Sequence, residues 1–131
     1  MPISDLPILS MLRTRMQWHQ DRQRLLSENV ANADTPNFKP RDLAPLDLAR
    51  ASARSGTVRL ALTDAAHQGG ANRSGFGASA QKTGESRPSG NAVNLEDEMM
   101  KVASNQMDYQ AATALYSRSL GLIKLALGSK Q

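Results

Sequence analysis

The residues of this chain whose types could support catalysis or metal binding are few and widely spaced. Gly75-Phe-Gly-Ala-Ser-Ala80 matches the glycine pattern of dinucleotide-binding turns, which lies between a strand and a helix. Here both flanks are rich in small polar residues, so we interpret the match as accidental. His19 and His67 are distant in sequence and cysteine is absent, so neither a set of three or four zinc ligands nor a disulfide is expected.

Glu96, Asp97 and Glu98 are consecutive carboxylates, which could act as a metal or acid–base cluster. They fall in the first turn of an expected helix, where acidic side chains complement the helix dipole, and we favour that interpretation. Nucleophilic catalysis would need a nucleophile on a sharp turn beside a base, and no segment offers this arrangement. The sequence therefore predicts that the chain is not an enzyme, with no catalytic residue, cofactor, metal or small-molecule substrate.

The chain that positions these residues has 131 residues, of which 40% are apolar and 4% aromatic. Its formal charge is +4 without any block of like charge, so no nucleic-acid partner is expected. The four arginines of residues 13–24 are interpreted as a solvated helix face.

The apolar cluster of residues 120–127 is far shorter than the roughly 20 residues that span a membrane. Nor does the N-terminus resemble a cleaved signal.

Two long helical patterns lie on either side of a middle segment that lacks such a pattern. The first covers residues 5–33, with Ser4 or Asp5 as a candidate cap and Pro7 in the first turn. Apolar residues recur along it at steps of three and four, interrupted by His19 and Gln23. We therefore predict an amphipathic seam. Its predicted members are Leu9, Leu12, Met16, Leu26, Val30 and Ala33.

The second helical pattern covers residues 94–128, with Asn94 as the expected N-cap and Gly128 as the stop. A helix of this length would be about 50 Å long and could bury its apolar stripe only beside another long helix. We predict that the first helix is this partner. The predicted seam residues are Leu95, Met99, Val102, Gln106, Tyr109, Thr113, Tyr116, Leu120, Ile123 and Leu127.

The middle of the chain divides into two parts. Residues 34–68 are expected to form a turn motif and a small β or extended element, with a strand at 57–63 where apolar and polar residues alternate. Residues 69–92 are rich in glycine and serine and are expected to be a flexible linker. The predicted fold is mainly α, with the two terminal helices paired as an antiparallel coiled coil.

One motif at the end of the first helix is more elaborate than a helix stop requires. Asn29 and Asn32 lie on one helix face, and their amides could satisfy backbone groups of a neighbouring chain. Pro36-Asn37 fits the centre of a type II turn, after which Phe38 would anchor the reversed chain. We predict that the motif is a subunit contact. Its residues are Asn29, Val30, Ala31, Asn32, Ala33, Asp34, Thr35, Pro36 and Phe38.

The run Asn29-Val-Ala-Asn-Ala-Asp-Thr-Pro-Asn-Phe38 resembles the N-terminal signature of the flagellar basal-body rod and hook family, in which N-I-A-N-A-D-T-P-G-Y ends the first helix. Four further segments resemble the proximal rod members of that family, as does the chain length. They are Phe38-Lys-Pro-Arg-Asp-Leu43, Thr63 to His67, Gly90-Asn-Ala-Val-Asn-Leu95 with Glu98-Met99, and Asn105-Gln-Met-Asp-Tyr-Gln110.

This resemblance implies a structural subunit of the proximal rod that polymerises through its terminal helices. The implied partners are copies of itself, other rod proteins, the MS-ring or rod adaptor, and the export gate. The implied place is the basal body at the inner-membrane and periplasmic side, reached through the flagellar type III apparatus without a cleaved signal. There the subunit would transmit torque and line the export channel. A soluble helical-hairpin adaptor or chaperone-like module is the alternative, and a second kind of proximal rod protein is a nearer one.

Overall fold

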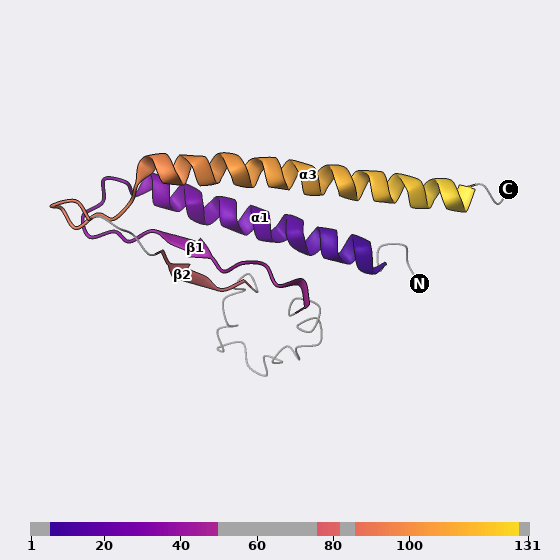
Figure 1. Cartoon of the computed structure of the whole chain (residues 1–131), viewed down its shortest axis with the longest axis horizontal. Helices are drawn as coiled ribbons and strands as arrows, with labels where there is room; N and C mark the ends of the chain where they lie inside the picture. The colour runs from indigo at the N-terminus through magenta and orange to yellow at the C-terminus, as the bar shows by residue number, and fades with distance from the viewer. Residues whose placement is uncertain (1–5, 50–75, 82–85, 129–131) are drawn as a thin grey trace, which may run out of the picture.

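The computed structural model describes residues 6–49, 76–81 and 86–128. Two long helices, α1 (Pro7–Ala31) and α3 (Leu95–Gly128), run antiparallel beside each other (Figure 1). A short antiparallel ribbon of β1 (Arg41–Leu43) and β2 (Ala78–Ala80) lies along α1. The chain is therefore a helical hairpin with a small β element, which confirms the predicted fold class.

Helix α1 begins at a proline, a residue that suits the first turn of a helix. Pro7 occupies the first turn, where its missing N–H has no helical partner to lose. Leu6 takes the N-cap position and makes no side-chain capping bond. The candidate caps Ser4 and Asp5 lie outside the described residues. The helix ends at Ala31, and the Asn32 backbone N–H then donates to the Glu28 carbonyl at 3.0 Å.

Helix α3 begins at the predicted cap. The Asn94 side-chain oxygen accepts a hydrogen bond from the Glu96 backbone N–H at 3.2 Å, and the first turn contains three acidic residues, Glu96, Asp97 and Glu98. At 1.5 Å per residue α3 is about 51 Å long and α1 about 37 Å, so α3 extends past the start of α1 (Figure 1). Within the described part of the chain, no helix combines the length and the apolarity needed to cross a membrane.

The chain reverses at the predicted turn. The Phe38 N–H donates to the Thr35 carbonyl at 3.4 Å, and Asn37 adopts a φ of 60°. Asparagine tolerates this left-handed conformation better than most residues, which explains why it occupies the third position of the turn. A second turn, closed by a hydrogen bond from the Gly90 N–H to the Arg87 carbonyl, packs against the first.

We call the end of the hairpin that contains these two turns the closed end, and the opposite end the open end. At the closed end, Gly90 is a position that only glycine fits. Its φ is +79°, and a Cβ added there would overlap the Asn37 side-chain oxygen. Gly90→Ala should therefore lower the free energy of unfolding by about 2 kcal/mol, measured by denaturation followed by circular dichroism. Gly121→Ala is the matched control, because a Cβ at that helical position meets nothing within 4 Å. The control should be neutral or gain up to about 1 kcal/mol; equal losses in both variants would contradict the expectation.

The β ribbon joins two segments that are distant in sequence. Arg41 is opposite Ala80, and Leu43 is opposite Ala78. The ribbon therefore includes residues of the segment 69–92, which was expected to be a flexible linker. It also places a strand inside the Gly75–Ala80 glycine pattern, where a phosphate-binding site would need a turn. The predicted strand at 57–63 and the segment Thr63 to His67 lie outside the described residues.

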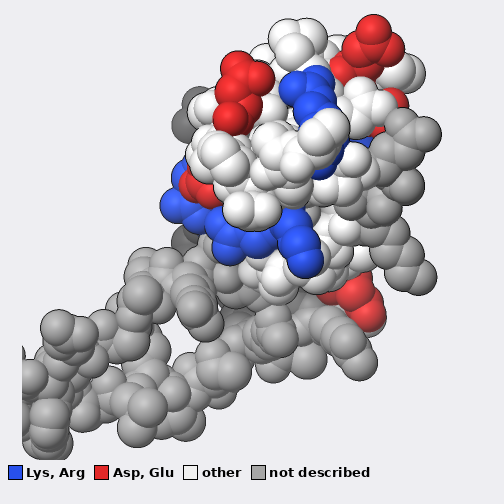
Figure 2. All heavy atoms as spheres, turned by 90° about the vertical axis from the view of Figure 1, so that its left-hand side faces the viewer, with Lys and Arg blue, Asp and Glu red and all other residues white. Residues whose placement is uncertain are grey.

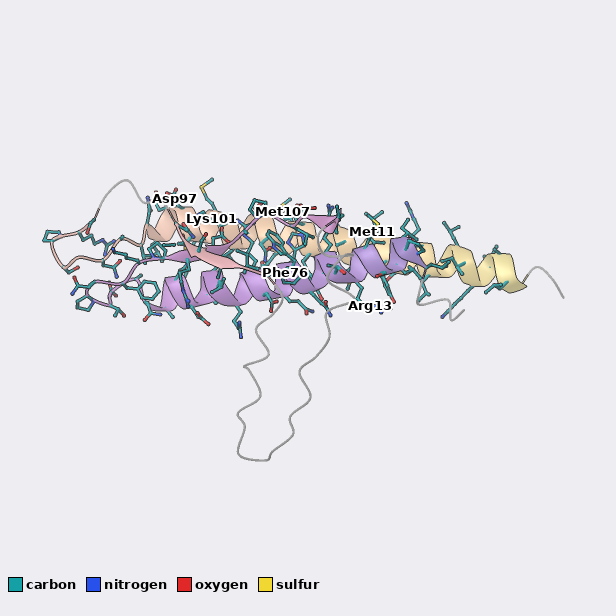
Figure 3. The ribbon with its side chains drawn as sticks, turned by 90° about the horizontal axis from the view of Figure 1, so that it is seen from below. Met11, Arg13, Phe76, Asp97, Lys101 and Met107 are labelled. Atoms are coloured by element: carbon teal, nitrogen blue, oxygen red, sulfur yellow. The ribbon has the colours of Figure 1, made fainter. Side chains whose placement is uncertain are left out.

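The ribbon is held on α1 by a small apolar cluster. Trp18 and Leu25, one heptad apart on α1, pack with Leu43 of β1, and Leu46 and Phe76 lie against them. Figure 3 shows Phe76 near the middle of the helix pair. Such a short ribbon would not be stable alone, so its position depends on this contact with α1.

Candidate functional site

Among the described helices and strands, the contact between α1 and α3 is the most extensive, and it is unusually polar at its centre. The buried residues of α3 are Glu98, Asn105 and Ala112, spaced by one heptad, and two of the three are polar. On α1 the buried residues facing this surface include Leu9, His19 and Leu26. Buried polar groups must be hydrogen-bonded, so the partners of Glu98 and Asn105 determine how the helices fit together.

The predicted seam agrees with the structure on α1 and differs from it on α3. On α1, Leu9 and Leu26 are buried, and four other predicted members are half-buried. On α3, Val102, Thr113 and four more are half-buried, but four predicted members are exposed within the single chain. The half-buried members are Leu12, Met16, Val30, Ala33, Val102, Tyr109, Thr113, Tyr116, Leu120 and Ile123, and the exposed ones are Leu95, Met99, Gln106 and Leu127.

This difference on α3 has a simple cause. After Val102, periodicity allows the next inward position to be 105 or 106, and neither candidate is apolar. The structure places Asn105 inward and Gln106 outward, and likewise Glu98 inward and Met99 outward. At these two places the predicted line therefore lies one residue too far along, because periodicity does not show which of two neighbouring residues has hydrogen-bond partners on α1.

Asn29 connects all three layers of the closed end. Its amide oxygen accepts from the Arg41 N–H at 3.0 Å, and its amide nitrogen donates to the Arg41 carbonyl at 2.7 Å. The same nitrogen donates to the Glu98 carboxylate at 2.9 Å. Asn29 thus pairs with β1 as a neighbouring strand would, and it also binds α3. Glu98, which is 2% exposed, completes its bonding with Lys101 at 3.2 Å.

Asn105 forms a second polar connection about halfway along the hairpin. Its amide nitrogen donates to the His19 carbonyl at 2.9 Å and to the Gln23 side-chain oxygen at 3.1 Å. Its amide oxygen lies 2.7 Å from His19 Nδ1 and can only accept, so Nδ1 carries the proton. All the hydrogen-bonding capacity of this buried amide nitrogen is used across the helix pair. The residues that seemed to interrupt the α1 seam are the partners it requires.

Asn32 and Asn91 organise the turn that follows α1. The Asn32 amide donates to the Glu28 carbonyl at 2.7 Å, and its oxygen accepts from the Thr35 hydroxyl at 3.1 Å. Asn91, 1% exposed, donates to the carbonyls of Asn32 at 2.9 Å and Thr35 at 2.7 Å. Asn91 was not predicted from the sequence to be a site residue. Its signal was the Gly90-Asn91 pair preceding a helix cap, a common composition in loops.

Some residues of the predicted contact motif therefore bond within their own chain, and others are exposed. The Asn29 and Asn32 amides satisfy groups of their own chain rather than being left for a neighbour. Phe38 is half-buried, and its carbonyl accepts from the Ala92 N–H at 3.0 Å. Asp34, Thr35 and Pro36 are exposed, as is Ala31. That this motif contacts another subunit stays a prediction, now centred on its exposed residues.

An ion pair between α1 and β1 also holds the ribbon in place. Arg22 donates to both carboxylate oxygens of Asp42 at 3.0 Å, the bidentate geometry that arginine favours. The Arg22 guanidinium also lies 5.4 Å from the centre of the Trp18 ring, and the Trp18 indole N–H donates to the Ala44 carbonyl at 3.0 Å. Trp18, the only tryptophan, therefore reports on ribbon docking through its fluorescence.

The closed end carries charges of both signs. Figure 2 shows basic and acidic side chains close together on this end. Two weak, exposed pairs contribute, Arg41–Glu28 at 3.5 Å and Arg87–Asp34 at 3.9 Å. Among the described residues, no group of three or more histidine, aspartate or glutamate side chains converges as metal ligands would.

The side of α3 that faces away from α1 carries a row of large apolar side chains, interrupted by the exposed Arg118. We call this side the outer face, and it carries five large exposed side chains within one arc of the helix. Met107 and Leu125 are 70% and 75% exposed, and Figure 3 shows Met107 between the closed end, marked by Asp97 and Lys101, and the open end, marked by Met11. Water-soluble monomers rarely expose a row of this kind. Its members are Met100, Met107, Leu115, Leu122 and Leu125.

Comparisons with known proteins give consistent matches. Residues 9–39 match a family model described as "Flagella basal body rod protein". The chain is 37% identical over 111 residues to "Flagellar basal body rod protein FlgB" of Cereibacter sphaeroides, covering 82% of this chain and 84% of that protein. It is 29% identical over 114 residues to the FlgB protein of Agrobacterium fabrum, covering 84% of each, and 30% identical over 115 residues to that of Salmonella typhimurium, covering 82% and 83%.

Proposed function

The chain belongs to the FlgB family of flagellar basal body rod proteins, and from this membership we propose that it polymerises through its two terminal helices. It is a structural subunit of the rod, not an enzyme, and it assembles with other components of the basal body rod. The finer proposal concerns which surfaces make those contacts and where in the basal body they lie.

The observation that carries the proposal is the outer face of α3. A row of large apolar side chains along a helix is normally covered by a neighbour. One side of α3 is covered by α1, whereas Met100, Met107 and Leu122 on the other are 72%, 70% and 65% exposed. Covering each such side chain contributes about 2 kcal/mol, so a neighbouring subunit that packs there would gain substantially.

The exposed end of α3 extends this surface. Its last turns continue past the start of α1, and Leu125 and Leu127 there are 75% and 53% exposed. We propose that copies of this chain and other rod proteins cover the outer face and this end. We also propose that the MS-ring or rod adaptor and the export gate are neighbours of the subunit.

The remaining parts of the proposal concern where the subunit lies in the basal body and what it does there. The subunit would lie at the inner-membrane and periplasmic side of the rod and reach it unfolded through the flagellar type III apparatus, without a cleaved signal. In the rod, a ring of such hairpins would transmit torque and line the export channel. Family membership supports this proposal, and so does the continuous antiparallel pair of helices, because close-packed helices resist twisting.

Incorporation into the basal body tests the proposal. A tagged copy expressed in a flagellated bacterium that lacks its own FlgB should restore swimming and remain with detergent-purified basal bodies after washing. A soluble adaptor or chaperone-like module would instead stay in the soluble fraction while swimming is restored. Recovery only in the soluble fraction would reject the rod assignment for this chain.

A further inference from the structure

The contact between α1 and α3 buries two polar residues of α3, Glu98 and Asn105. Half-buried apolar residues of α3, such as Val102 and Ile123, favour this side of the helix. Apolar side chains recur along both helices, so they allow more than one alignment of the pair. The buried polar residues discriminate between alignments, because their hydrogen-bond partners lie at fixed positions on α1.

The register of the pair depends on Asn105 in particular. In the observed register its amide lies opposite His19 and Gln23, which together offer it two acceptors and one donor. Sliding the helices by one heptad in one direction would place it opposite Leu12 and Met16. Sliding them in the other direction would place it opposite Leu26 and Val30. Neither apolar pair has a side-chain partner for the amide, so each slip would bury an unsatisfied polar group.

The hydrogen bonds of Glu98 at the closed end also favour the observed register. Glu98 is 2% exposed and takes a hydrogen bond from Asn29, which at the same time holds β1. A slip that moved Glu98 toward the open end would bring it near Arg22, a possible partner, but one already bound to Asp42. Glu98 therefore discriminates between registers less sharply than Asn105.

We infer that Asn105, with His19 and Gln23, is the specificity-determining contact that fixes the register of the α1–α3 pair, the alignment in which the outer face remains for a neighbouring subunit. A single buried amide has this role in coiled coils, where it excludes other alignments at some cost in stability. The reservation of the outer face rests on the proposed function, whereas the control of register does not.

Distance measurements between two spin labels test the register in the full chain. Ser27 on α1 and Ser117 on α3 are both exposed, and the chain has no cysteine, so Ser27→Cys and Ser117→Cys give two unique labelling positions. A slip of one heptad changes their separation by about 10 Å. Diluting the labelled chain with unlabelled chain removes distances between molecules. The unmodified pair should give one narrow distance.

Two variants of the labelled chain should lose this single distance. Replacing the connection by leucine, as His19→Leu, Gln23→Leu and Asn105→Leu, should add a second distance about 10 Å away while helicity is retained. Exchanging two residues, as Asn105→Ala and Ala112→Asn, moves the amide by one heptad without changing composition. A population about 10 Å shorter should then appear, because His19 and Gln23 would follow the amide.

Gln106→Leu is the matched control, since it makes the same change of polarity at the adjacent exposed position, and it should keep the single distance. The inference is overturned if the unmodified chain already shows several distances, or if both the leucine and the exchange variants keep one. Because the exchange keeps the amide, it remains informative should the leucine variant fold poorly. The assay involves no rod, so its failure would leave the rod role standing, and failure of basal body incorporation would leave the register result standing.

Discussion

Asn29→Ala should destabilise the hairpin by about 3 kcal/mol, the largest loss we expect from truncating one polar side chain of this chain. The alanine would leave the Arg41 N–H without its partner, would remove the shorter of the two bonds to the Arg41 carbonyl, and would remove one of the two donors to the buried Glu98 carboxylate. Both helices and the ribbon depend on this amide, so they should loosen together. Chemical denaturation followed by circular dichroism and by Trp18 fluorescence measures the two parts separately.

Asn32→Ala is the natural comparison, because it removes the other asparagine of the same motif. The Asn32 side chain makes exposed bonds to Glu28 and Thr35 at the end of α1, so its loss should cost about 1 kcal/mol. In Asn29→Ala the changes in helicity and in tryptophan fluorescence should both move to a lower denaturant concentration than in the unmodified chain, because the amide contacts both the helix pair and the ribbon. Equal losses in the two variants would show that Asn29 does not have the connecting role described above.

Met107→Asp combined with Leu122→Asp should abolish swimming and remove the subunit from purified basal bodies while leaving its fold intact. Both side chains are exposed in the single chain, at 70% and 65%, so a charge there costs the monomer little. In the assembly we propose, each aspartate would be buried against an apolar neighbour without a counter-charge, at a cost of several kcal/mol. Swimming in soft agar and immunoblots of basal bodies provide the measurement, with circular dichroism of the purified chain as the check on folding.

Met107→Leu combined with Leu122→Met keeps the outer face apolar at nearly constant volume and should retain swimming. Comparing the two pairs separates the effect of charge from that of altering these positions. If the aspartate variant still enters basal bodies and swims normally, the outer face of α3 is not the surface on which neighbouring subunits pack.

The helices and their ends could be predicted from local patterns. Pro7 and Asn94 mark helix starts because a missing N–H and a capping oxygen act within one turn of the chain. Asn37 marks the reversal because few residues accept its positive φ. These signals depend on neighbours in the sequence, so they are visible without any knowledge of the fold.

The ribbon and the polar connections could not be predicted in this way. Strands of three residues carry too little alternation to be recognised, and Leu43 meets Ala78 only because the intervening chain returns to it. Glu98 was interpreted as compensating the helix dipole, an interpretation that fits Glu96 and Asp97, which are exposed. Its burial follows from Asn29, far away in the sequence.

The sequence by itself determined that this protein is a pair of long terminal helices, with the signature that places it among rod proteins and apolar stripes on both helices that require partners. Periodicity predicted the side of α3 that carries Val102, Tyr109 and Tyr116, which are half-buried in the structure. Only the tertiary structure decided which polar residues of α3 lie inward beside them. The choice of Glu98 and Asn105 depends on hydrogen bonds to Asn29, His19 and Gln23, which have value only when the two helices are in one alignment.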